Sequence, residues 1–182
     1  MKRIVCLILM VLIFAGCSSE KPNFTYDIQY QDADMSAYNG VNSVDHNFKK
    51  ININEFYNCV DNKSSAIFYF GYSGCGCCQS TIKYLNQAAQ DFNVDIYYID
   101  AYEPPLSDED RIKFEEYTYD ILAENEDGEK VLQTPTIFNV INGKINDYII
   151  CTGNMTWNKN PNESQINKLK NVYSKIFKPF IK

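Results

Sequence analysis

The feature that most constrains this chain is a pair of cysteines at the start of an expected helix. Residues 66–70 are apolar and mostly aromatic, which predicts a buried strand, and the glycines in residues 71–74 predict a turn. The helix is expected to open at Cys75 and to continue to about residue 89. Because a helix start carries unpaired N–H groups and a partial positive charge, Cys75 is expected to ionise more readily than a free cysteine. Cys78 lies three residues further on, on the same helical face, so the two sulfurs can close a small disulfide.

The beginning of the chain has the pattern of an export signal. Two basic residues precede an apolar run over residues 4–14, which is shorter than the roughly 18 residues of a membrane-spanning helix. The run ends at Ala15-Gly16-Cys17, which resembles the lipobox of bacterial lipoproteins, in which the cysteine is lipidated and becomes the new N-terminus. The resemblance implies a signal peptide over residues 1–16 and a lipid on Cys17. An ordinary secretory signal and an uncleaved anchor are the alternatives.

The expected mature chain is acidic. The full sequence has 17 Lys and Arg against 23 Asp and Glu, and removal of Lys2 and Arg3 with the signal leaves 15 against 23, a net charge of −8. Such a chain is a poor binder of nucleic acid and gains no overall attraction from an anionic membrane, so its membrane link would be the lipid. The expected location is therefore extracytoplasmic, on a bacterial cell membrane.

Residues 17–47 are polar and predict a tether between the lipidated cysteine and the domain. The tyrosines in this segment leave an alternative, in which it folds back onto the domain as a short strand.

Residues 48–182 are enough for one domain with one core. A strand, a helix and a second strand at this spacing predict a parallel crossover unit. Asn142-Gly143 between two apolar runs predicts a tight hairpin, and the acidic residues 124–129 predict a solvated loop. The expected strands are 48–51, 66–70, 94–100, 136–141 and 145–151, and the expected helices are 52–60, 75–89, 107–122 and 161–176.

This order of elements and two motifs resemble the thioredoxin superfamily over residues 48–178. One motif is Cys75-Gly76-Cys77-Cys78; the other is Gln133-Thr134-Pro135-Thr136, which matches the family's cis-proline loop. The resemblance implies an α/β, thioredoxin-like fold, with a central mixed sheet, a parallel β-α-β unit and a C-terminal antiparallel hairpin, flanked by helices. It also implies that Pro135 faces the active cysteines and that the backbone of Thr134 pairs with the substrate chain. Within the superfamily, the chain looks most like the small thioredoxin-like proteins of Gram-positive bacteria, including bacteriocin transport accessory proteins.

The activity that the resemblance implies is thiol–disulfide exchange without a cofactor. Cys75 attacks a substrate disulfide, or is attacked when oxidised, and Cys78 resolves the mixed disulfide. The implied partners are extracytoplasmic proteins with disulfides or dithiols, and a separate protein that supplies or removes electrons. Both directions of electron flow stay open.

Two family positions that assist proton transfer to the resolving cysteine differ in this chain. Thioredoxin has a buried Asp in the central strand and a Lys in the next one, where this sequence has Tyr69 and Ile96. Proton handling is therefore expected to come from water or another group. Asp100 and Glu103 are candidates through their proximity in sequence.

Three further cysteines have alternative interpretations. Cys77 stands where thioredoxin has a proline; it is expected to be a bystander thiol, with an accessory thiol that pairs with Cys75 as the functional alternative. If Cys75, Cys77 and Cys78 act together, the chain is instead a lipoprotein that binds Cu(I) or Zn(II), because soft thiolates select those metals. A fold used only for protein binding is a third class. Cys59 and Cys151 each end an apolar element, which predicts core packing, with a disulfide between them as the alternative.

Overall fold

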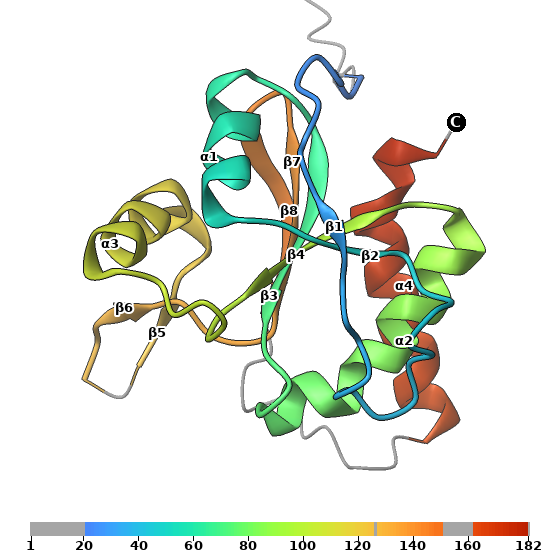
Figure 1. Ribbon diagram of the computed structural model, residues 1–182. Coiled ribbons are helices and arrows are strands. Elements are labelled where there is room, and N and C mark those ends of the chain that lie inside the picture. The colour runs from blue at the N-terminus through green and yellow to red at the C-terminus, as the bar shows by residue number, and fades with distance from the viewer. Residues whose placement is uncertain (1–20, 126, 151–161, 182) are drawn as a thin grey trace, which may run out of the picture.

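A mixed β-sheet with helices on both faces forms the centre of the computed structural model, which describes residues 21–125, 127–150 and 162–181 (Figure 1). The strands of this sheet are β1 (Gln31–Asp32), β2 (Phe48–Lys50), β3 (Ala66–Gly71), β4 (Ile96–Asp100), β7 (Thr136–Ile141) and β8 (Lys144–Ile150). The helices are α1 (Ile53–Asp61), α2 (Gly76–Phe92), α3 (Asp108–Tyr117) and α4 (Glu163–Phe177), with short 3-10 turns at Tyr119–Ile121 and Lys178–Phe180. A separate two-stranded sheet consists of β5 (Ala123–Glu124) and β6 (Lys130–Val131).

The strand order confirms the predicted thioredoxin-like α/β fold. Within the described residues the main sheet has the order β1-β2-β4-β3-β7-β8. Strands β2, β3 and β4 are parallel, so β3-α2-β4 is the expected crossover unit, and β7 and β8 form the expected antiparallel hairpin. Helices α2 and α4 cover one face of the sheet, and α1 and α3 cover the other (Figure 1).

The central strand β3 is buried along its whole length. Its side chains alternate between two cores, because successive residues of a strand point to opposite faces. Ile67 and Tyr69 pack under α2 and α4, and Phe68 and Phe70 pack under α1 and α3. This burial on both faces fixes the position of the turn that leaves β3, and therefore the start of α2.

Side chains cap three of the helices, at or next to the helix starts that the sequence predicts. The Asn52 and Ser107 side chains accept N–H bonds at the starts of α1 and α3. At α4, Asn162 and Gln165 form a reciprocal capping box. The helix starts are thus set by local chemistry as well as by packing.

The hairpin turn has the expected conformation. Asn142 and Gly143 have φ angles of 52° and 79°, the left-handed pair that a tight hairpin requires. The Gly143 N–H also donates to the Ser64 carbonyl at 2.9 Å, so the turn is tied to the residues before β3.

Most of the acidic stretch expected to be a solvated loop lies between the paired strands β5 and β6, and residues 127–129 are exposed. The structure differs from the sequence prediction in two other segments. The helix expected over residues 107–122 ends at Tyr117, and a 3-10 turn follows at Tyr119–Ile121. Residues 21–47 lie against the domain: β1 pairs with β2, and Met35 and Tyr38 are buried. Residues 21–47 therefore fold back onto the domain, which is the alternative to a tether that the sequence left open. Their few apolar side chains are spaced so that they reach the core.

The expected signal peptide and the lipidation candidate Cys17 lie outside the described residues, so both stay predictions. In the part of the chain that the structure describes, no helix has both the length and the apolar composition to cross a bilayer.

Two glycines with the same backbone conformation test the packing of the hairpin turn. Gly143 and Gly128 both have a φ of 79°, but a Cβ on Gly143 would lie 2.5 Å from the Val60 carbonyl oxygen, whereas nothing lies within 4 Å of one on Gly128. Both alanine substitutions destabilise the protein, because alanine is strained in the left-handed backbone conformation. We expect Gly143→Ala to lower the free energy of unfolding, measured by urea denaturation, by about 1–3 kcal/mol more than Gly128→Ala. Equal losses in the two variants would contradict this account of the turn.

Candidate active site

Cys75 caps the start of α2 with its sulfur. Its backbone is extended, and its Sγ accepts the Cys78 N–H at 3.3 Å, as an N-cap oxygen does in other helices. The turn before it is closed by the Cys75 N–H, which donates to the Tyr72 carbonyl at 3.2 Å. The first helical residue is Gly76, so the predicted helix start is displaced by one residue and the sulfur lies at the end of the helix axis.

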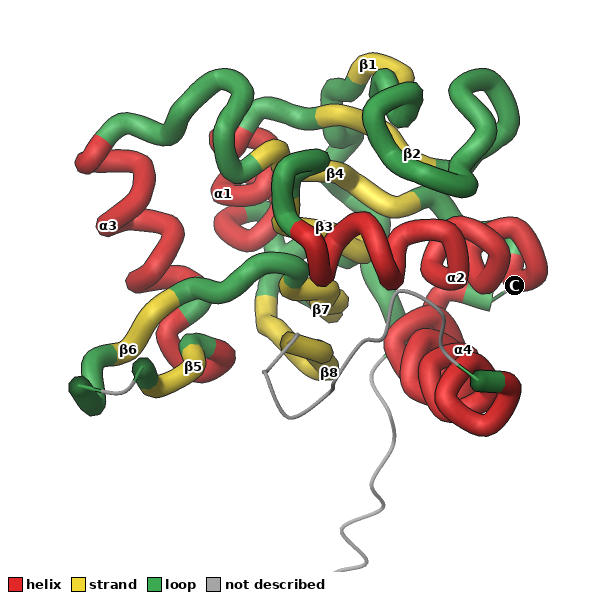
Figure 2. Tube along the Cα trace, turned by 90° about the horizontal axis from the view of Figure 1, so that it is seen from below, coloured by secondary structure: helices red, strands yellow, loops and turns green. Residues whose placement is uncertain are grey.

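The loop before β7 lies against Cys75. Because Phe70 near the end of β3 pairs with Thr136 at the start of β7, the two adjoining loops meet at the same end of the sheet (Figure 2). The Cys75 thiol donates to the Thr134 carbonyl at 3.5 Å. The Thr134–Pro135 peptide bond is cis, and Pro135 is buried. The structure thus brings together the four residues Cys75, Cys78, Thr134 and Pro135 that the two motifs nominate.

The two sulfurs occupy different environments. Cys75 is partly exposed, whereas Cys78 lies one turn inward, is 0% exposed, and belongs to the core between α2 and the sheet. A protein disulfide in solution can therefore reach Cys75 but not Cys78.

This difference in burial separates the ionisation of the two thiols. Burial alone raises the pKa of Cys75, but hydrogen bonds from the Cys78 thiol and the Cys78 N–H outweigh it, and the pKa is lowered from its ordinary value. Burial, together with the hydrogen bond to Cys75, raises the pKa of Cys78 to about 12. Thiolate at neutral pH is therefore concentrated on Cys75, the form that acts as nucleophile.

A row of tyrosine hydroxyls lies beneath the cysteine pair. Tyr69 of β3 packs in the same core as Cys78. Nearby, the Tyr38 and Tyr98 hydroxyls are 3.2 Å apart, and Tyr98 donates to Asp100 Oδ2 at 2.8 Å.

Asp100 and Glu103 are the two carboxylates that their proximity in sequence suggested as proton acceptors. Of these two described side chains, only that of Asp100 is hydrogen-bonded to the row of tyrosines. Glu103 contacts Asp100 through its backbone, because its N–H donates to Asp100 Oδ1 at 3.0 Å. Sequence reasoning missed Tyr38, because it lies in the segment expected to be a tether. The signal that could have revealed it is the spacing of Ala33, Met35 and Tyr38, all three of which are buried.

The remaining cysteines do not match all of the expectations. Cys77 is disulfide-bonded, which is neither the bystander thiol nor the accessory thiol that the sequence suggests; its partner lies outside the described residues. Cys59 is a free thiol at 0% exposure, and burial raises its pKa to about 12. Core packing therefore describes Cys59, and it forms no disulfide with Cys151, which lies outside the described residues.

Among residues 21–125, 127–150 and 162–181, no three His, Cys, Asp or Glu side chains lie close enough together to hold a metal ion.

Comparison with known proteins yields similarities of fold. No protein-family model matches the chain, and no curated protein matches it by sequence. Thioredoxin O2 from Arabidopsis thaliana in the oxidized state has 18% identity and a TM-score of 0.46, with 72% of this chain and 96% of that chain covered. Thioredoxin from Trypanosoma brucei brucei has 16% identity and a TM-score of 0.45, with 76% and 97% covered. Because these identities and TM-scores are low, the fold assignment rests on the strand order and the placement of the helices.

The pKa difference predicts how Cys75 reacts with an alkylating agent. In the reduced protein we expect the pH midpoint for alkylation of Cys75, followed by mass spectrometry of its peptide, to lie below that of an ordinary free thiol. Cys78→Ala removes the side-chain donor and is expected to raise the midpoint, whereas Cys78→Ser keeps a donor and is expected to leave it close to wild type.

Cys59→Ala is the matched control, because Cys59 is equally buried but lies in the other core. It is expected to leave the Cys75 midpoint unchanged. A wild-type midpoint at or above that of a free thiol would contradict the assignment of Cys75 as nucleophile.

Proposed function

We propose that this protein is a membrane-tethered thiol–disulfide oxidoreductase that exchanges disulfides with extracytoplasmic proteins through Cys75 and Cys78. The observation that carries the proposal is the pairing of a partly exposed thiol of lowered pKa with a buried thiol of raised pKa at one helix start. The two roles of an exchange reaction, attack and resolution, need these two different sulfurs.

In the reducing direction, the Cys75 thiolate attacks one sulfur of a substrate disulfide. A mixed disulfide forms between Cys75 and the substrate, and the other substrate sulfur leaves as a thiolate. Cys78 then loses its proton and attacks the Cys75 sulfur. The Cys75–Cys78 disulfide closes, the second substrate sulfur leaves, and two electrons have passed from the protein to the substrate. In the oxidising direction the same steps run in reverse.

The surroundings of Cys75 suit a polypeptide substrate. Thr134 presents its carbonyl beside the sulfur, where an extended substrate chain can form backbone hydrogen bonds. The rings of Tyr72 and Tyr102 lie with their centroids 4.4 Å apart, and Tyr102 is 62% exposed. Exposed tyrosines are enriched at protein interfaces, because they add apolar contact area and a polar tip.

The position of the described N-terminal segment supports attachment through Cys17. The Asn23 N–H donates to Ser65 Oγ at 3.0 Å and to Asn142 Oδ1 at 2.9 Å, which fixes the segment at the beginning of β3. Cys75 follows the other end of β3, about 20 Å away for a strand of this length. Three residues lie between Cys17 and Lys21, so the Cα atoms of these two residues are at most about 14 Å apart. A lipid on Cys17 would therefore hold the domain close to the bilayer, with the cysteine pair facing away from it.

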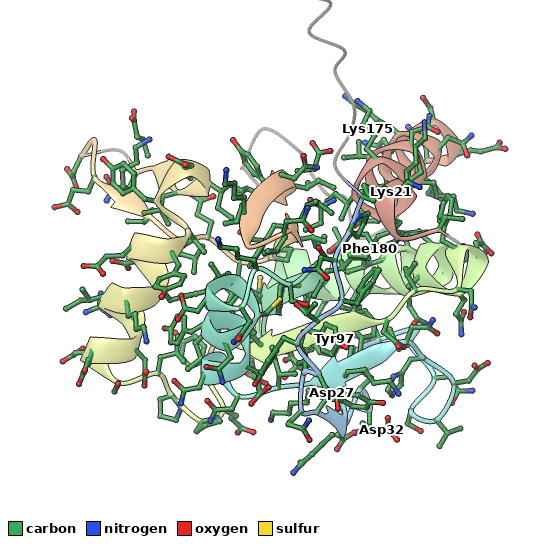
Figure 3. The ribbon with its side chains drawn as sticks, turned by 90° about the horizontal axis from the view of Figure 1, so that it is seen from above. Lys21, Asp27, Asp32, Tyr97, Lys175 and Phe180 are labelled. Carbon is green, nitrogen blue, oxygen red and sulfur yellow. The ribbon has the colours of Figure 1, made fainter. Side chains whose placement is uncertain are left out.

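Local charge supports the same orientation. A groove of about 860 Å³ lies at the end of the domain where residue 21 lies, and Figure 3 shows Lys21 and Lys175 together there. Its charged lining residues are four lysines, Lys21, Lys144, Lys175 and Lys178, and one carboxylate, Asp147. Although the chain is acidic overall, this end can approach an anionic membrane surface favourably.

The thiolate metal-binding alternative has less support. It requires three sulfurs, and with Cys77 in a disulfide the described thiols at the site are Cys75 and Cys78. Metal analysis of protein purified under reducing conditions separates the two functions. Near-stoichiometric copper or zinc without exchange activity would favour the alternative.

Insulin reduction by dithiothreitol tests the activity. We expect Cys75→Ser to abolish catalysis, because the nucleophile is lost, and Cys78→Ser to accumulate a mixed disulfide that is visible by mass spectrometry. Cys77→Ser is the matched control within the same motif and is expected to keep activity within a few-fold. Full activity of the Cys75→Ser variant would rule out the proposed function.

The membrane link is tested separately in a bacterial host that expresses the full chain. Wild type is expected in the membrane fraction with a covalent lipid, and Cys17→Ala is expected to lose both. In intact cells, a membrane-impermeant maleimide is expected to label Cys75, with Cys75→Ser defining the background. Equal membrane association of the Cys17→Ala variant, or labelling only after lysis, would contradict the proposed location.

A further inference from the structure

The hydroxyl of Tyr69 is an unusual feature of the core. The side chain is 0% exposed, and its Oη has no hydrogen-bond partner among the described residues. An unpaired buried hydroxyl destabilises a fold, and phenylalanine would fill the same space without that cost. A functional role would explain why tyrosine and not phenylalanine occupies this position.

The neighbours of this hydroxyl are the resolving thiol and a second phenol. Tyr69 packs in one buried cluster with Cys78 and Tyr38, and its ring centroid lies 5.6 Å from that of Tyr98. Neither the Cys78 thiol nor the Tyr38 hydroxyl meets hydrogen-bond geometry with the Tyr69 Oη, but after burial itself both raise the pKa of Tyr69. The end of the Tyr69 ring lies over Gly71, where an added Cβ would be 2.7 Å from Oη. The absence of a side chain at Gly71 is what lets the phenol reach toward the cysteine end of the sheet.

From Tyr38 the row continues to the surface through two hydrogen bonds. The Tyr98 hydroxyl donates its one proton to Asp100 Oδ2 at 2.8 Å. The 3.2 Å contact between Tyr38 and Tyr98 therefore has Tyr38 as donor, which leaves the Tyr38 oxygen free to accept from Tyr69. Asp100 is partly exposed, and its Oδ1 accepts two backbone N–H groups of the following turn, so the carboxylate is held in place at the edge of the solvent.

We propose that Tyr69, Tyr38 and Tyr98 form a proton relay that connects the Cys78 thiol with the Asp100 carboxylate. The relay rests on the proposed function of the cysteine pair and explains how the buried member of that pair becomes a nucleophile. Thioredoxin has an Asp and a Lys at the positions of Tyr69 and Ile96. In this chain the relay would accept the proton in place of those charged groups.

Resolution of the mixed disulfide would move one proton along this relay. As the Cys78 sulfur attacks the Cys75 sulfur of the mixed disulfide, its proton passes to the Tyr69 oxygen. Each phenol hands its own proton to the next oxygen, and the last one arrives on Asp100. The bond between Cys75 and the substrate breaks, the Cys75–Cys78 bond forms, and the substrate leaves as a thiolate. The phenols end as they began, and Asp100 releases the proton to water.

The environment of Cys78 makes such an acceptor necessary. At neutral pH a thiol with a pKa of about 12 is almost entirely protonated, and at 0% exposure bulk water does not reach it. The titratable groups that face the row are Cys78 from α2 with Cys75 at its N-cap, Tyr38 from the N-terminal segment, and Tyr98 and Asp100 from β4. Burial raises the pKa of all three phenols, so they stay neutral and pass a proton on without storing charge.

Reaction of the reduced protein with one equivalent of a nitrothiobenzoate disulfide separates the relevant steps. The first coloured thiolate is released when Cys75 attacks, and the second when Cys78 resolves the mixed disulfide. Cys75→Ser defines the release from other thiols. If wild type shows no second phase, the proposed function itself is wrong. If wild type releases the second thiolate, the exchange function holds, and the rate of this phase in the variants tests the relay.

In Tyr69→Phe we expect an unchanged first phase and a second phase slowed by roughly 100-fold, the usual contribution of a positioned proton acceptor. The wild-type second phase is expected to be nearly independent of pH around neutrality. In the variant it is expected to rise roughly tenfold per pH unit, because only spontaneously ionised Cys78 reacts. Tyr69→Phe loses no hydrogen bond of the described structure, so its urea midpoint is expected to be at least that of wild type.

Further variants separate a relay from a packing effect. Tyr98→Phe and Asp100→Asn interrupt the same path and are expected to slow the second phase similarly. The Tyr69→Phe/Asp100→Asn double variant is expected to be no slower than either single variant, because one break already stops transfer.

The matched control is Tyr57→Phe. Tyr57 is a buried tyrosine in the other core, and its hydroxyl donates to the Asp110 carbonyl at 2.8 Å. This variant is expected to lose stability but keep both phases. A second phase in Tyr69→Phe with the wild-type rate and pH profile would overturn the relay and show that water takes the proton.

Discussion

The hydrogen bond from the Cys78 N–H to the Cys75 sulfur is the contact on which this site depends. It places one sulfur at the positive end of α2 and, through the pitch of the helix, sends the other sulfur inward to the core. The two thiols therefore receive opposite pKa shifts from one short segment of chain. The order of the sheet then completes the site, because the pairing of β3 with β7 brings the Thr134 carbonyl against the outer sulfur.

Three tyrosines, Tyr38, Tyr69 and Tyr98, lie in the apolar core that contains Cys78, and their chemistry decides how that core can transfer a proton. A carboxylate buried under Cys78 would carry a large desolvation cost, whereas a phenol is neutral and still both donates and accepts a hydrogen bond. With Tyr69 at the inner end and Asp100 at the partly exposed end, the charged group lies near water and the buried groups stay neutral. The same tyrosine side chains can therefore fill the core and transfer a proton.

The sequence was most informative where local chemistry decides the structure. The apolar run of β3, the Asn52 and Ser107 helix starts and the Asn142-Gly143 turn each carry a local signal. The fold and the position of the cysteine pair were predicted from these signals together with the family resemblance. The Thr134 loop could be placed near Cys75 only through the family resemblance, because their contact joins residues 59 positions apart.

What the sequence did not predict depends on distant contacts. The segment before β2 is polar on average, and that average concealed the few side chains, such as Met35 and Tyr38, that reach the core. The net charge likewise concealed the lysines that gather around one groove. The disulfide of Cys77 and the isolation of Cys59 depend on which sulfurs meet in space, and neither spacing nor composition carries that information.

The equilibrium reduction potential of the Cys75/Cys78 couple, measured against a glutathione buffer, tests the central claim most directly. A pair of sulfurs built for exchange is expected to form its disulfide reversibly, at a potential within the range of about −270 to −120 mV that exchange proteins occupy. A potential below about −300 mV, as in structural disulfides, or oxidation that leaves Cys75 and Cys78 unpaired, would contradict the account.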